Sequence, residues 1–409
     1  MAQDFVGSNN MNLLEPSGQF GTRLAGGADA ASPRYIFTHL SPFARYLFPE
    51  EDDILLEYLE DDGQIIEPRY FCPIIPLVLV NGSQGIGSGW STFIPPHNPL
   101  VVLDYIRGKL ENRPNLPSIE PYVRGFKGEI SRHDNGTCFV SSGRIRELNA
   151  SAVLIDELPI GVWTNKYKEQ LLKLQRKGLI TDFVEDHTTT KVSFKVKLKS
   201  MQLKRMKQSG LEKSFGLKSN LRITNMNAFD ENGAIQKFAS AESIADAYFP
   251  TRLNLYHDRK SALLSEMEYA STVQRNKARF IKAVSNGEID LIGGRNSRDE
   301  LAAMLQNFDF DSSHDLDVIR RKNTVADSTN TQSEDDEEED GGSLEDGSVV
   351  HNASGFDYLL KMPLSSLTTE RIEGLNLDAD KTEKEVAELR SKTAEELWMS
   401  DLEKLAGQL

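Results

Sequence analysis

The sequence predicts a multidomain α/β protein whose C-terminal part is helical. Its 409 residues are enough for two or three domains, each with a core of its own. From about residue 51 to residue 250, strand and helix patterns are mixed. Beyond Pro250, apolar residues recur at every third or fourth position over about thirty residues, which indicates a long amphipathic helix.

Composition limits the classes of protein to be considered. Hydrophobic residues make up 39% of the chain and no uninterrupted apolar run reaches the length of a membrane span, so we expect a soluble protein without a membrane partner. The start of the chain, Met1 to Phe5, lacks the basic and apolar regions of a secretory signal. Cys72 and Cys138 have no metal-ligand spacing and suit a reducing compartment better than a disulfide framework.

Charge is distributed unevenly along the chain. The net charge is −15, but nine of the acidic residues lie between Glu334 and Asp346, where there is no base, so the remainder carries −6. The stretch from Lys191 to Arg222 has ten basic residues against Glu212 alone, a local net charge of +9. Such a run is often only a solvated face, but it also suits a surface that faces phosphate groups.

The first 250 residues predict short elements. Residues 1 to about 50 are expected to form helical and loop pieces, beginning inside a structural element. Leu77 to Val80 is interpreted as a buried strand that runs into a glycine-rich loop. Val192 to Lys199 alternates apolar with mostly basic residues, which predicts a half-buried strand with a basic outer face. Leu221 to Met226 is predicted as a second strand, followed by a turn at Asp230 to Gly233.

The remainder predicts helices around a polar insert. The helix beyond Pro250 would be roughly 50 Å long at about 1.5 Å per residue, with apolar positions at Leu253, Tyr256, Leu263, Met267, Ala270, Ile281 and Val284. A capping-box pattern at Thr393 to Glu396 predicts a later helix that holds Leu397, Trp398, Leu402 and Leu405. Two long helices suit an antiparallel coiled coil, although an ordinary amphipathic bundle has the same periodicity. The polar, acidic segment from about 324 to 354 is expected to be disordered.

An arginine and a tyrosine stand side by side in the most informative stretch, Gly18 to Tyr35. Glycine- and proline-rich backbone presents Arg34 and Tyr35 outside any apolar run. A phenol oxygen can attack phosphorus and leave again, and a neighbouring guanidinium can hold two phosphate oxygens at once. Taken alone, such a pair is more often an ordinary loop or interface tyrosine than a nucleophile.

The chain resembles the eukaryotic DNA topoisomerase II family, in order and over most of its length. The matching segments are DFVGSNN (4–10), GQFGTRL (18–24), DAASPRYIFT (29–38), PIIP (73–76), NGSQGIGSGW (81–90), WT with YKEQ (163–170), and YLL with MPL (358–364). The resemblance implies the C-terminal part of a DNA breakage-and-reunion core. It places the end of a winged-helix domain with the catalytic tyrosine at 1–50, a mixed α/β tower domain at 51–250, and an antiparallel coiled coil with the exit-gate insert at 251–409.

The resemblance also implies an activity. Tyr35 would be the nucleophile that forms a 5′-phosphotyrosyl bond with one strand of double-stranded DNA, and Arg34 would bind the phosphate and stabilise its developing charge. A homodimer would break both strands, pass a second duplex and reseal the break, which controls supercoiling and catenation. Mg²⁺ would be held by a glutamate and paired aspartates upstream of Met1, ATP would be used by a separate N-terminal domain, and the protein would be nuclear.

The resemblance implies DNA contacts at further positions. Ile86, in the glycine-rich loop, would enter a base step and bend the duplex, the alternative being burial in a local core. Trp163 matches a tryptophan that lies at DNA, although a tryptophan at such a position is ordinarily a core residue. The backbone of the duplex would be contacted from the segment 217–225, by Lys218, Ser219, Asn220, Arg222 and Asn225. A dinucleotide-binding reading of the loop fails because the third glycine of that motif would fall on Trp90.

Three alternatives remain at this point. The chain could be a catalytically incomplete piece that only binds and bends DNA and dimerises, because the family's metal ligands and ATPase domain are not in it. It could be a coiled-coil scaffold unrelated to nucleic acid, which would leave the basic strand without a role. Asp52–Asp53 and Asp61–Asp62 could substitute as metal ligands, but their surroundings are typical of solvated turns. No role is assigned to the seven scattered histidines.

Overall fold

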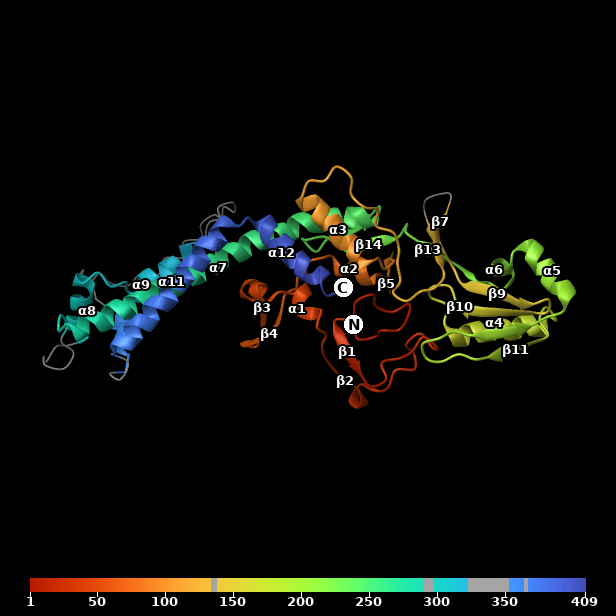
Figure 1. The fold of residues 1–409 in the computed structure, drawn as a ribbon, viewed down its shortest axis with the longest axis horizontal. Helices are drawn as coiled ribbons and strands as arrows, with labels where there is room; N and C mark the ends of the chain where they lie inside the picture. The colour runs from red at the N-terminus through yellow and green to blue at the C-terminus, as the bar shows by residue number, and fades with distance from the viewer. Residues whose placement is uncertain (134–137, 290–297, 323–352, 364–366) are drawn as a thin grey trace, which may run out of the picture. The chain divides into compact units, whose positions relative to one another are not determined.

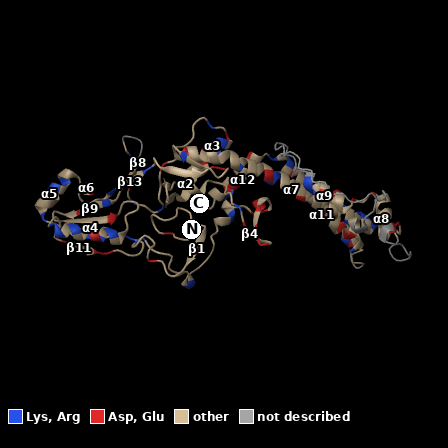
Figure 2. Cartoon of the chain, turned by 180° about the vertical axis from the view of Figure 1, so that it is seen from behind, with Lys and Arg blue, Asp and Glu red and all other residues tan. Residues whose placement is uncertain are grey.

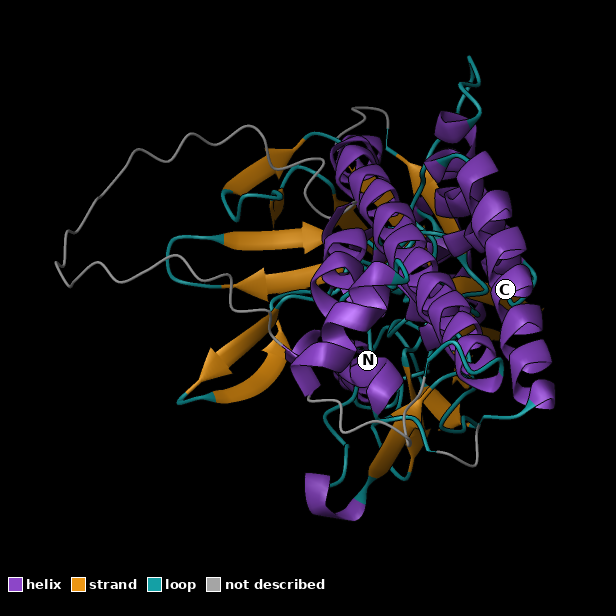
Figure 3. Ribbon diagram, turned by 90° about the vertical axis from the view of Figure 1, so that its left-hand side faces the viewer, coloured by secondary structure: helices purple, strands orange, loops and turns teal. Residues whose placement is uncertain are grey.

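The computed structural model describes residues 1–133, 138–289, 298–322, 353–363 and 367–409 (Figure 1). The chain forms two compact units. The first consists of Met1–Glu50, Tyr58–Leu253 and Trp398–Leu409, and the second of Glu51–Glu57 and Asn254–Leu397. Among the described residues, every strand belongs to the first unit and the second is helical. Figure 3 distinguishes the helices, strands and loops by colour. The predicted mixture of helices and strands with one long helix is therefore confirmed. The segment 324–354 lies outside the described residues, apart from its last two positions.

The N-terminal part of the first unit contains a pair of short strands that the sequence did not predict. Strand β1 (Leu14–Ser17) pairs antiparallel with β2 (Phe37–Leu40). The expectation of only helical and loop pieces in residues 1–50 was wrong here, because strands of four residues without alternating burial leave no periodic pattern. The 3₁₀ turn η1 (Pro33–Tyr35) comes directly before β2, and the helical turn α1 (Ala44–Leu47) follows it.

The predicted strand at 77–80 is a helical turn. Helix α2 (Leu77–Asn81) follows Pro76 and buries Leu79 and Val80. A run of four apolar residues suits a buried strand and a buried helical turn equally well, so periodicity could not separate them. The helix ends at Gly82, whose φ of 72° and close approach to the carbonyl of Ile94 exclude a side chain. Beyond it, β5 (Ser83–Ile86) and β6 (Ser91–Ile94) form a hairpin.

A four-stranded antiparallel sheet forms the largest core of the first unit. Its strand order is β11–β12–β10–β9, namely Asp182–Glu185, Phe194–Lys197, Ala152–Glu157 and Arg144–Asn149. Helices α4 (Thr164–Arg176) and α5 (Ser200–Ser209) pack on one face through Tyr167, Leu171, Leu203 and Met206. Phe194 and Val196 are buried and Lys195 and Lys197 exposed, which confirms the predicted half-buried strand with a basic outer face.

The other strands form small sheets and hairpins. Strand β13 (Lys218–Arg222) pairs with β8 (Cys138–Ser142), which pairs with β7 (Glu129–Arg132); β14 (Met226–Phe229) pairs with β15 (Ile235–Phe238), and β3 (Tyr58–Asp61) with β4 (Gln64–Pro68). The strand predicted at 221–226 was wrong in its bounds, since two strands share that region. The turn at 230–233 is confirmed, because the Gly233 amide donates to the Asp230 carbonyl at 3.1 Å. The remaining elements are α3 (Pro99–Leu110), α6 (Leu211–Ser214) and the 3₁₀ helix η2 (Glu50–Leu55).

The long helix begins earlier than predicted. Helix α7 spans Ala241–Ser285, with Pro250 inside it. Proline is favoured in the first turn of a helix, so Pro250 was read as a boundary. The turns before it are held by tertiary packing, because Ala241, Ile244 and Ala245 are buried in the first unit. Their burial offsets the roughly 3 kcal/mol that an internal proline costs.

In the second unit, α7 and α11 (Thr369–Ser391) run antiparallel. Arg275 near the end of α7 pairs with Asp380 and Glu383 at 2.5 and 2.9 Å. Glu268, earlier in α7, pairs with Arg390, later in α11. The elements between the two helices are α8 (Arg298–Asn307), α9 (Ser313–Lys322), the 3₁₀ turn η3 (Ala353–Phe356) and α10 (Asp357–Leu360). They build a small core with the end of α7, around Phe280, Leu305, Phe310, Phe356 and Leu359.

The last helix, α12 (Ala394–Ala406), begins with the predicted capping box. The Thr393 amide donates to the Glu396 carboxylate at 2.8 Å, and the Glu396 amide donates to the Thr393 hydroxyl at 3.2 Å. Trp398 is completely buried, and its indole Nε1 donates to the Ile74 carbonyl at 3.0 Å. Within the described residues, no helix is both long and apolar enough for a membrane span.

Candidate nucleic-acid interface

Arg34 and Tyr35 are both accessible. Tyr35 ends the turn η1, where its amide donates to the Ser32 carbonyl at 2.9 Å, and 68% of the residue is exposed. The guanidinium carbon of Arg34 lies 5.5 Å from the centroid of the Tyr35 ring. The arrangement therefore presents a phenol hydroxyl and a cation together to solvent, where a phosphodiester can reach both.

The loop before Tyr35 is closed by its own hydrogen bonds. Asp29 accepts from the amide and the hydroxyl of Thr22 at 2.8 and 2.6 Å. These hydrogen bonds, that of the Thr22 hydroxyl above all, lower the pKa of Asp29 although partial burial opposes them. The Ala31 amide donates to the Gln19 carbonyl at 2.9 Å, which closes the loop four residues before Tyr35. These hydrogen bonds fix the backbone of the loop just before the segment that carries Tyr35.

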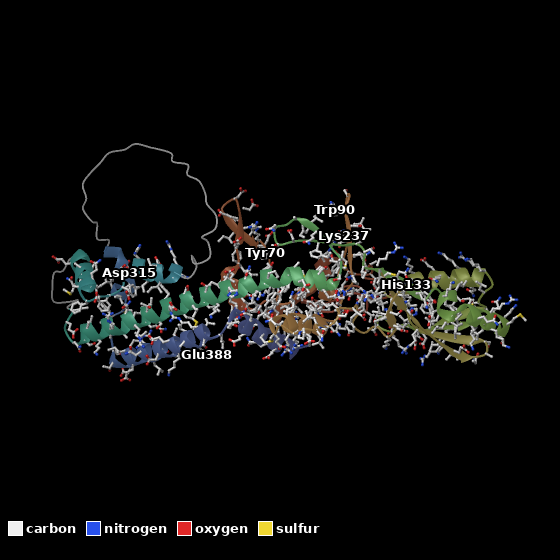
Figure 4. All side chains as sticks on the ribbon, turned by 90° about the horizontal axis from the view of Figure 1, so that it is seen from above. Tyr70, Trp90, His133, Lys237, Asp315 and Glu388 are labelled. Atoms are coloured by element: carbon white, nitrogen blue, oxygen red, sulfur yellow. The ribbon has the colours of Figure 1, made fainter. Side chains whose placement is uncertain are left out.

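The hairpin of β5 and β6 exposes Ile86 almost completely, at 89%. The structure thus excludes the alternative that Ile86 fills a local core. The tight turn that follows is closed by a 2.8 Å hydrogen bond from the Gly87 amide to the Trp90 carbonyl. Trp90, 55% exposed, lies at the outer end of the same hairpin (Figure 4). Trp90 was not predicted as a contact residue, although a tryptophan beside bare glycine backbone is itself a signal of an exposed aromatic.

Asn225 and Asn227 support this hairpin from the side. The Asn225 side chain donates to the Ser91 hydroxyl at 2.8 Å, and the Asn227 side chain donates to the Ser91 carbonyl at 2.7 Å. The Thr92 hydroxyl donates to the Asn227 carbonyl at 2.7 Å. Asn225, predicted as a phosphate contact, is thus engaged with Ser91, the residue that stands opposite Ile86 in the hairpin. Asn227 was not predicted.

Asn10 joins that hairpin to the N-terminal segment. The Nδ2 atom of this buried side chain lies 2.9 Å from the carbonyl oxygens of Val80, His97 and Tyr122. Its Oδ1 accepts from the Arg124 amide at 2.8 Å. Val80 precedes the hairpin and His97 follows it, so one side chain holds both ends of the hairpin to the segment that leads into β1. No local sequence pattern could have indicated contacts with residues so distant in the chain.

Trp163 packs against the loop that precedes Tyr35. It is half-buried at the start of α4, and its ring meets Phe5 edge-on, with centroids 5.8 Å apart. A Cβ added to Gly26 would lie 2.2 Å from the indole, so the ring lies directly on the backbone of that glycine. The structure therefore places Trp163 against the loop that leads to Tyr35.

Strand β13 divides the predicted phosphate contacts between its two faces. Lys218, Asn220 and Arg222 are exposed, whereas Ser219 is half-buried on the side of the buried Leu221. Lys218 pairs with Glu212 at 3.0 Å, so part of the local positive charge is neutralised. Figure 2 shows further lysines and arginines along α4 and α5.

The described residues hold no group of three or more His, Cys, Asp or Glu side chains arranged for a metal ion. Asp52 lies 3.6 Å from Arg259, and Asp61 lies exposed in β3. The residues that the structure describes therefore do not fit a Mg²⁺ site. Neither Cys72 nor Cys138 is in a disulfide. Among the histidines, burial lowers the pKa of His97 to about 4, against smaller opposing effects of the Leu79 carbonyl and Glu242.

Comparisons with known proteins show which family the chain belongs to. The family model that describes the A subunits of DNA gyrase and topoisomerase IV matches residues 1–403. DNA topoisomerase 2 of Arabidopsis thaliana is 40% identical over 100% of the chain and 28% of the relative, and DNA topoisomerase 2-beta of Gallus gallus is 39% identical over 98% and 24%. The chain thus spans about a quarter of the length of these curated relatives.

A solved structure is similar over nearly the whole chain. It is the crystal structure of the Plasmodium falciparum topoisomerase II DNA-binding, cleavage and re-ligation domain, with a TM-score of 0.84 and 37% identity. The similarity covers 99% of this chain and 53% of that one. The resemblance seen in the sequence motifs is confirmed at the level of sequence and fold, and the chain belongs to the family of the DNA gyrase and topoisomerase IV A subunits.

Proposed function

We propose that this chain is the DNA-gate portion of a type II DNA topoisomerase, an isomerase that breaks and reseals double-stranded DNA. The observation that carries the proposal is the accessible pair of Arg34 and Tyr35 on a closed loop, in a chain of this family. The solved relative is named for DNA binding, cleavage and re-ligation, the activities that such a pair would serve.

In the proposed reaction, the Tyr35 hydroxyl oxygen attacks a backbone phosphorus of DNA. The phenol gives up its proton, the new bond joins the tyrosine oxygen to phosphorus, and the bond from phosphorus to the 3′ oxygen breaks. The 3′ oxygen leaves as a hydroxyl after it takes a proton. Arg34 holds the phosphate and stabilises the charge that develops on its oxygens. Attack by the 3′ hydroxyl on the phosphotyrosyl bond reverses each step and reseals the strand.

Other predicted contacts would hold and bend the duplex. Ile86 would enter a base step, at a cost of a few kcal/mol that wider contacts with the bent duplex offset. Its exposure favours this role, as do the hydrogen bonds that Asn225 and Asn227 donate to Ser91 of its hairpin. Lys218, Asn220 and Arg222 would face phosphates, while Ser219, Asn225 and Trp163 would contribute from positions partly occupied by protein contacts.

The domain assignments belong to the same proposal. Residues 1–50 would be the end of a winged-helix domain, 51–250 a tower domain, and 251–409 a coiled coil with the exit gate. The antiparallel pair of α7 and α11, with a small core between them in sequence, supports the last assignment. Two copies would act on opposite strands of one duplex in the nucleus. Mg²⁺, which supplies charge stabilisation at the phosphate when bound, and ATP would be held by other parts of the family's proteins, since the described residues offer no group for the metal.

Covalent capture on DNA tests the proposal. The chain is mixed with the family's metal-binding fragment, Mg²⁺ and a nicked duplex labelled 3′ to the break, then denatured and run on a gel. A labelled covalent band that Tyr35→Phe abolishes is expected. If DNA binds in a salt-sensitive way but no band forms, the second candidate applies: a piece that binds and bends DNA without cutting it, which the lack of a metal group among the described residues favours for the chain by itself.

A further inference from the structure

A buried ion pair connects the loop of residues 19–31, which precedes Tyr35, to the four-stranded sheet. Arg23 lies in the loop and Glu157 at the end of β10, and their side chains are 7% and 1% exposed. An Nη2 atom of Arg23 donates to Oε1 of Glu157. Removing one member of such a pair leaves the other as an uncompensated buried charge, which is strongly destabilising.

The Glu157 carboxylate also accepts hydrogen bonds from backbone amides outside the loop. Its Oε1 accepts from the Leu158 amide at 2.9 Å, and its Oε2 accepts from the Lys127 amide at 3.0 Å. The carboxylate therefore has a fixed orientation before Arg23 reaches it. A rigid, oriented acceptor is what a docking point for a loop requires.

The start of α4 provides a second set of contacts with the same loop. The first amides of a helix have no partner within the helix, and Trp163 at the N-cap does not supply one from its side chain. Instead, the Asn165 amide donates to the Leu24 carbonyl at 3.0 Å, and the Thr164 amide approaches the Arg23 carbonyl at 3.5 Å. The indole of Trp163 covers Gly26, where φ is 65° and no Cβ could be accommodated.

We propose that these contacts form a joint that positions Tyr35, with Glu157 as its positioning residue. The joint consists of Arg23, Leu24 and Gly26 in the loop, and Glu157 and Trp163 on the sheet side. A hydrogen bond between Gln19 and Ala31 closes the loop four residues before Tyr35. Contacts that hold the loop in place therefore limit where Tyr35 can lie. The part of this inference that concerns cleavage rests on the proposed function, whereas the docking of the loop does not.

Hydrogen exchange tests the docking without reference to any activity. Glu157→Gln removes the charge but keeps the shape, and Asp156→Asn is the matched control. Asp156 is the neighbouring acid on the opposite face of β10 from Glu157, where it pairs with Arg144 and Arg146 at 2.8 Å. We expect amides of residues 19–31 to exchange at least about tenfold faster in Glu157→Gln and unchanged in Asp156→Asn. Equal exchange in both variants would overturn the joint.

A second variant covers the case in which Glu157→Gln does not fold. Gly26→Ala places a methyl group against the Trp163 ring without altering any charge, and it should speed exchange over the same residues. Gly233→Ala, in a turn with nothing within 4 Å and a similar φ of 77°, is its control. If the loop amides stay protected in Gly26→Ala, the indole contact does not hold the loop, and the inference is wrong.

Covalent capture then tests the positioning of Tyr35. Glu157→Gln should lower the yield of covalent complex by about tenfold or more, while DNA affinity stays within about twofold, because no DNA contact is removed. If exchange rises but cleavage is unchanged, Tyr35 is not positioned through the joint. If the unaltered chain forms no covalent complex, the proposed function fails while the docking result stands.

Discussion

The side-chain amide of Asn227 donates to the backbone oxygen of Ser91 at 2.7 Å, and Ser91 stands opposite Ile86 in the hairpin of β5 and β6. Because Ile86 and Ser91 are partners in the hairpin register, this hydrogen bond fixes the strand opposite the exposed isoleucine. Asn227→Ala should leave the fold intact and loosen the hairpin. We expect DNA affinity within about threefold of the unaltered chain and a broader distribution of bend angles, measured by energy transfer between labelled duplex ends. An unchanged distribution would mean that the hairpin needs no such support.

Removal of the isoleucine side chain should affect DNA bending more than binding. With 89% of Ile86 exposed, Ile86→Ala should not change the free energy of unfolding measurably. The mean bend angle of a bound duplex should fall, because the side chain proposed to open a base step is gone. Ile235→Ala, a half-exposed isoleucine on β15, is the control. Bending that is equally reduced in both variants would contradict a specific role for Ile86.

The guanidinium of Arg34 should not be replaceable by an amine. Arg34→Lys keeps the charge but loses the planar fork that can hold two phosphate oxygens. We expect the rate of covalent complex formation to fall by about 10²-fold or more, which is the typical cost of losing one donor at a developing oxyanion. Arg45→Lys, which alters an exposed arginine 3.8 Å from Glu50, should have no effect. A single-turnover time course on nicked DNA measures both rates.

Stability should decrease in mild acid because of His97. Since a carbonyl only accepts, its Nδ1 donates to the Leu79 carbonyl at 2.9 Å, and burial lowers its pKa to about 4 from an ordinary value near 6.5. In the unfolded chain the imidazole takes up a proton below about pH 6.5, whereas in the folded chain it remains neutral down to about 4. Its contribution is thus fully present above pH 6.5 and is lost as the pH falls toward 4, by about 3 kcal/mol at most.

Urea unfolding measured at several values between pH 7 and pH 4 shows whether this holds. His97→Gln, which keeps a donor but has no titrating group, should flatten the dependence of the free energy of unfolding on pH over that range. A slope that is the same in both proteins would assign the acid sensitivity to other groups.

Trp398 should be essential to the packing of the first unit. Its indole is completely buried, stacks on Phe249 with centroids 5.1 Å apart, and donates to the Ile74 carbonyl. Trp398→Ala should lower the free energy of unfolding by about 3–5 kcal/mol, and Trp398→Phe by less, since only the hydrogen bond and part of the volume are lost. Differential scanning calorimetry gives both values. Leu377→Ala, at a surface position 71% exposed, should change little.

Local patterns predicted those elements in which burial and periodicity coincide. The alternation around Phe194 and Val196 predicted β12, because one face of that strand is buried and the other carries lysines. The capping box at Thr393 predicted the start of α12, since both reciprocal hydrogen bonds lie within four residues. By contrast, α2 and the first turns of α7 depend on what they pack against, so their sequences alone did not determine them.

The motifs of the candidate site could be predicted from the sequence, but the residues that hold these motifs in place could not. Tyr35, Arg34 and Ile86 stand in short segments with unusual backbone composition, and all three are in accessible positions, as their proposed roles require. Asn10 and Asn227 act by side-chain bonds to backbone groups from other parts of the chain. Such bonds leave no spacing or periodicity to recognise, because the partners are brought together only by the tertiary fold.

The alternating burial of β10 sets a limit on how this protein can diverge. Ala152, Leu154 and Asp156 lie on the more open side of the strand, and Val153, Ile155 and Glu157 on the buried side. Substitutions can be tolerated one position at a time. Insertion or deletion of a single residue would instead exchange the two neighbouring acids, turning Asp156 toward Arg23 and Glu157 toward the arginines outside. Related proteins that keep this ion pair should therefore vary in sequence between residues 152 and 157 and keep the number of residues constant.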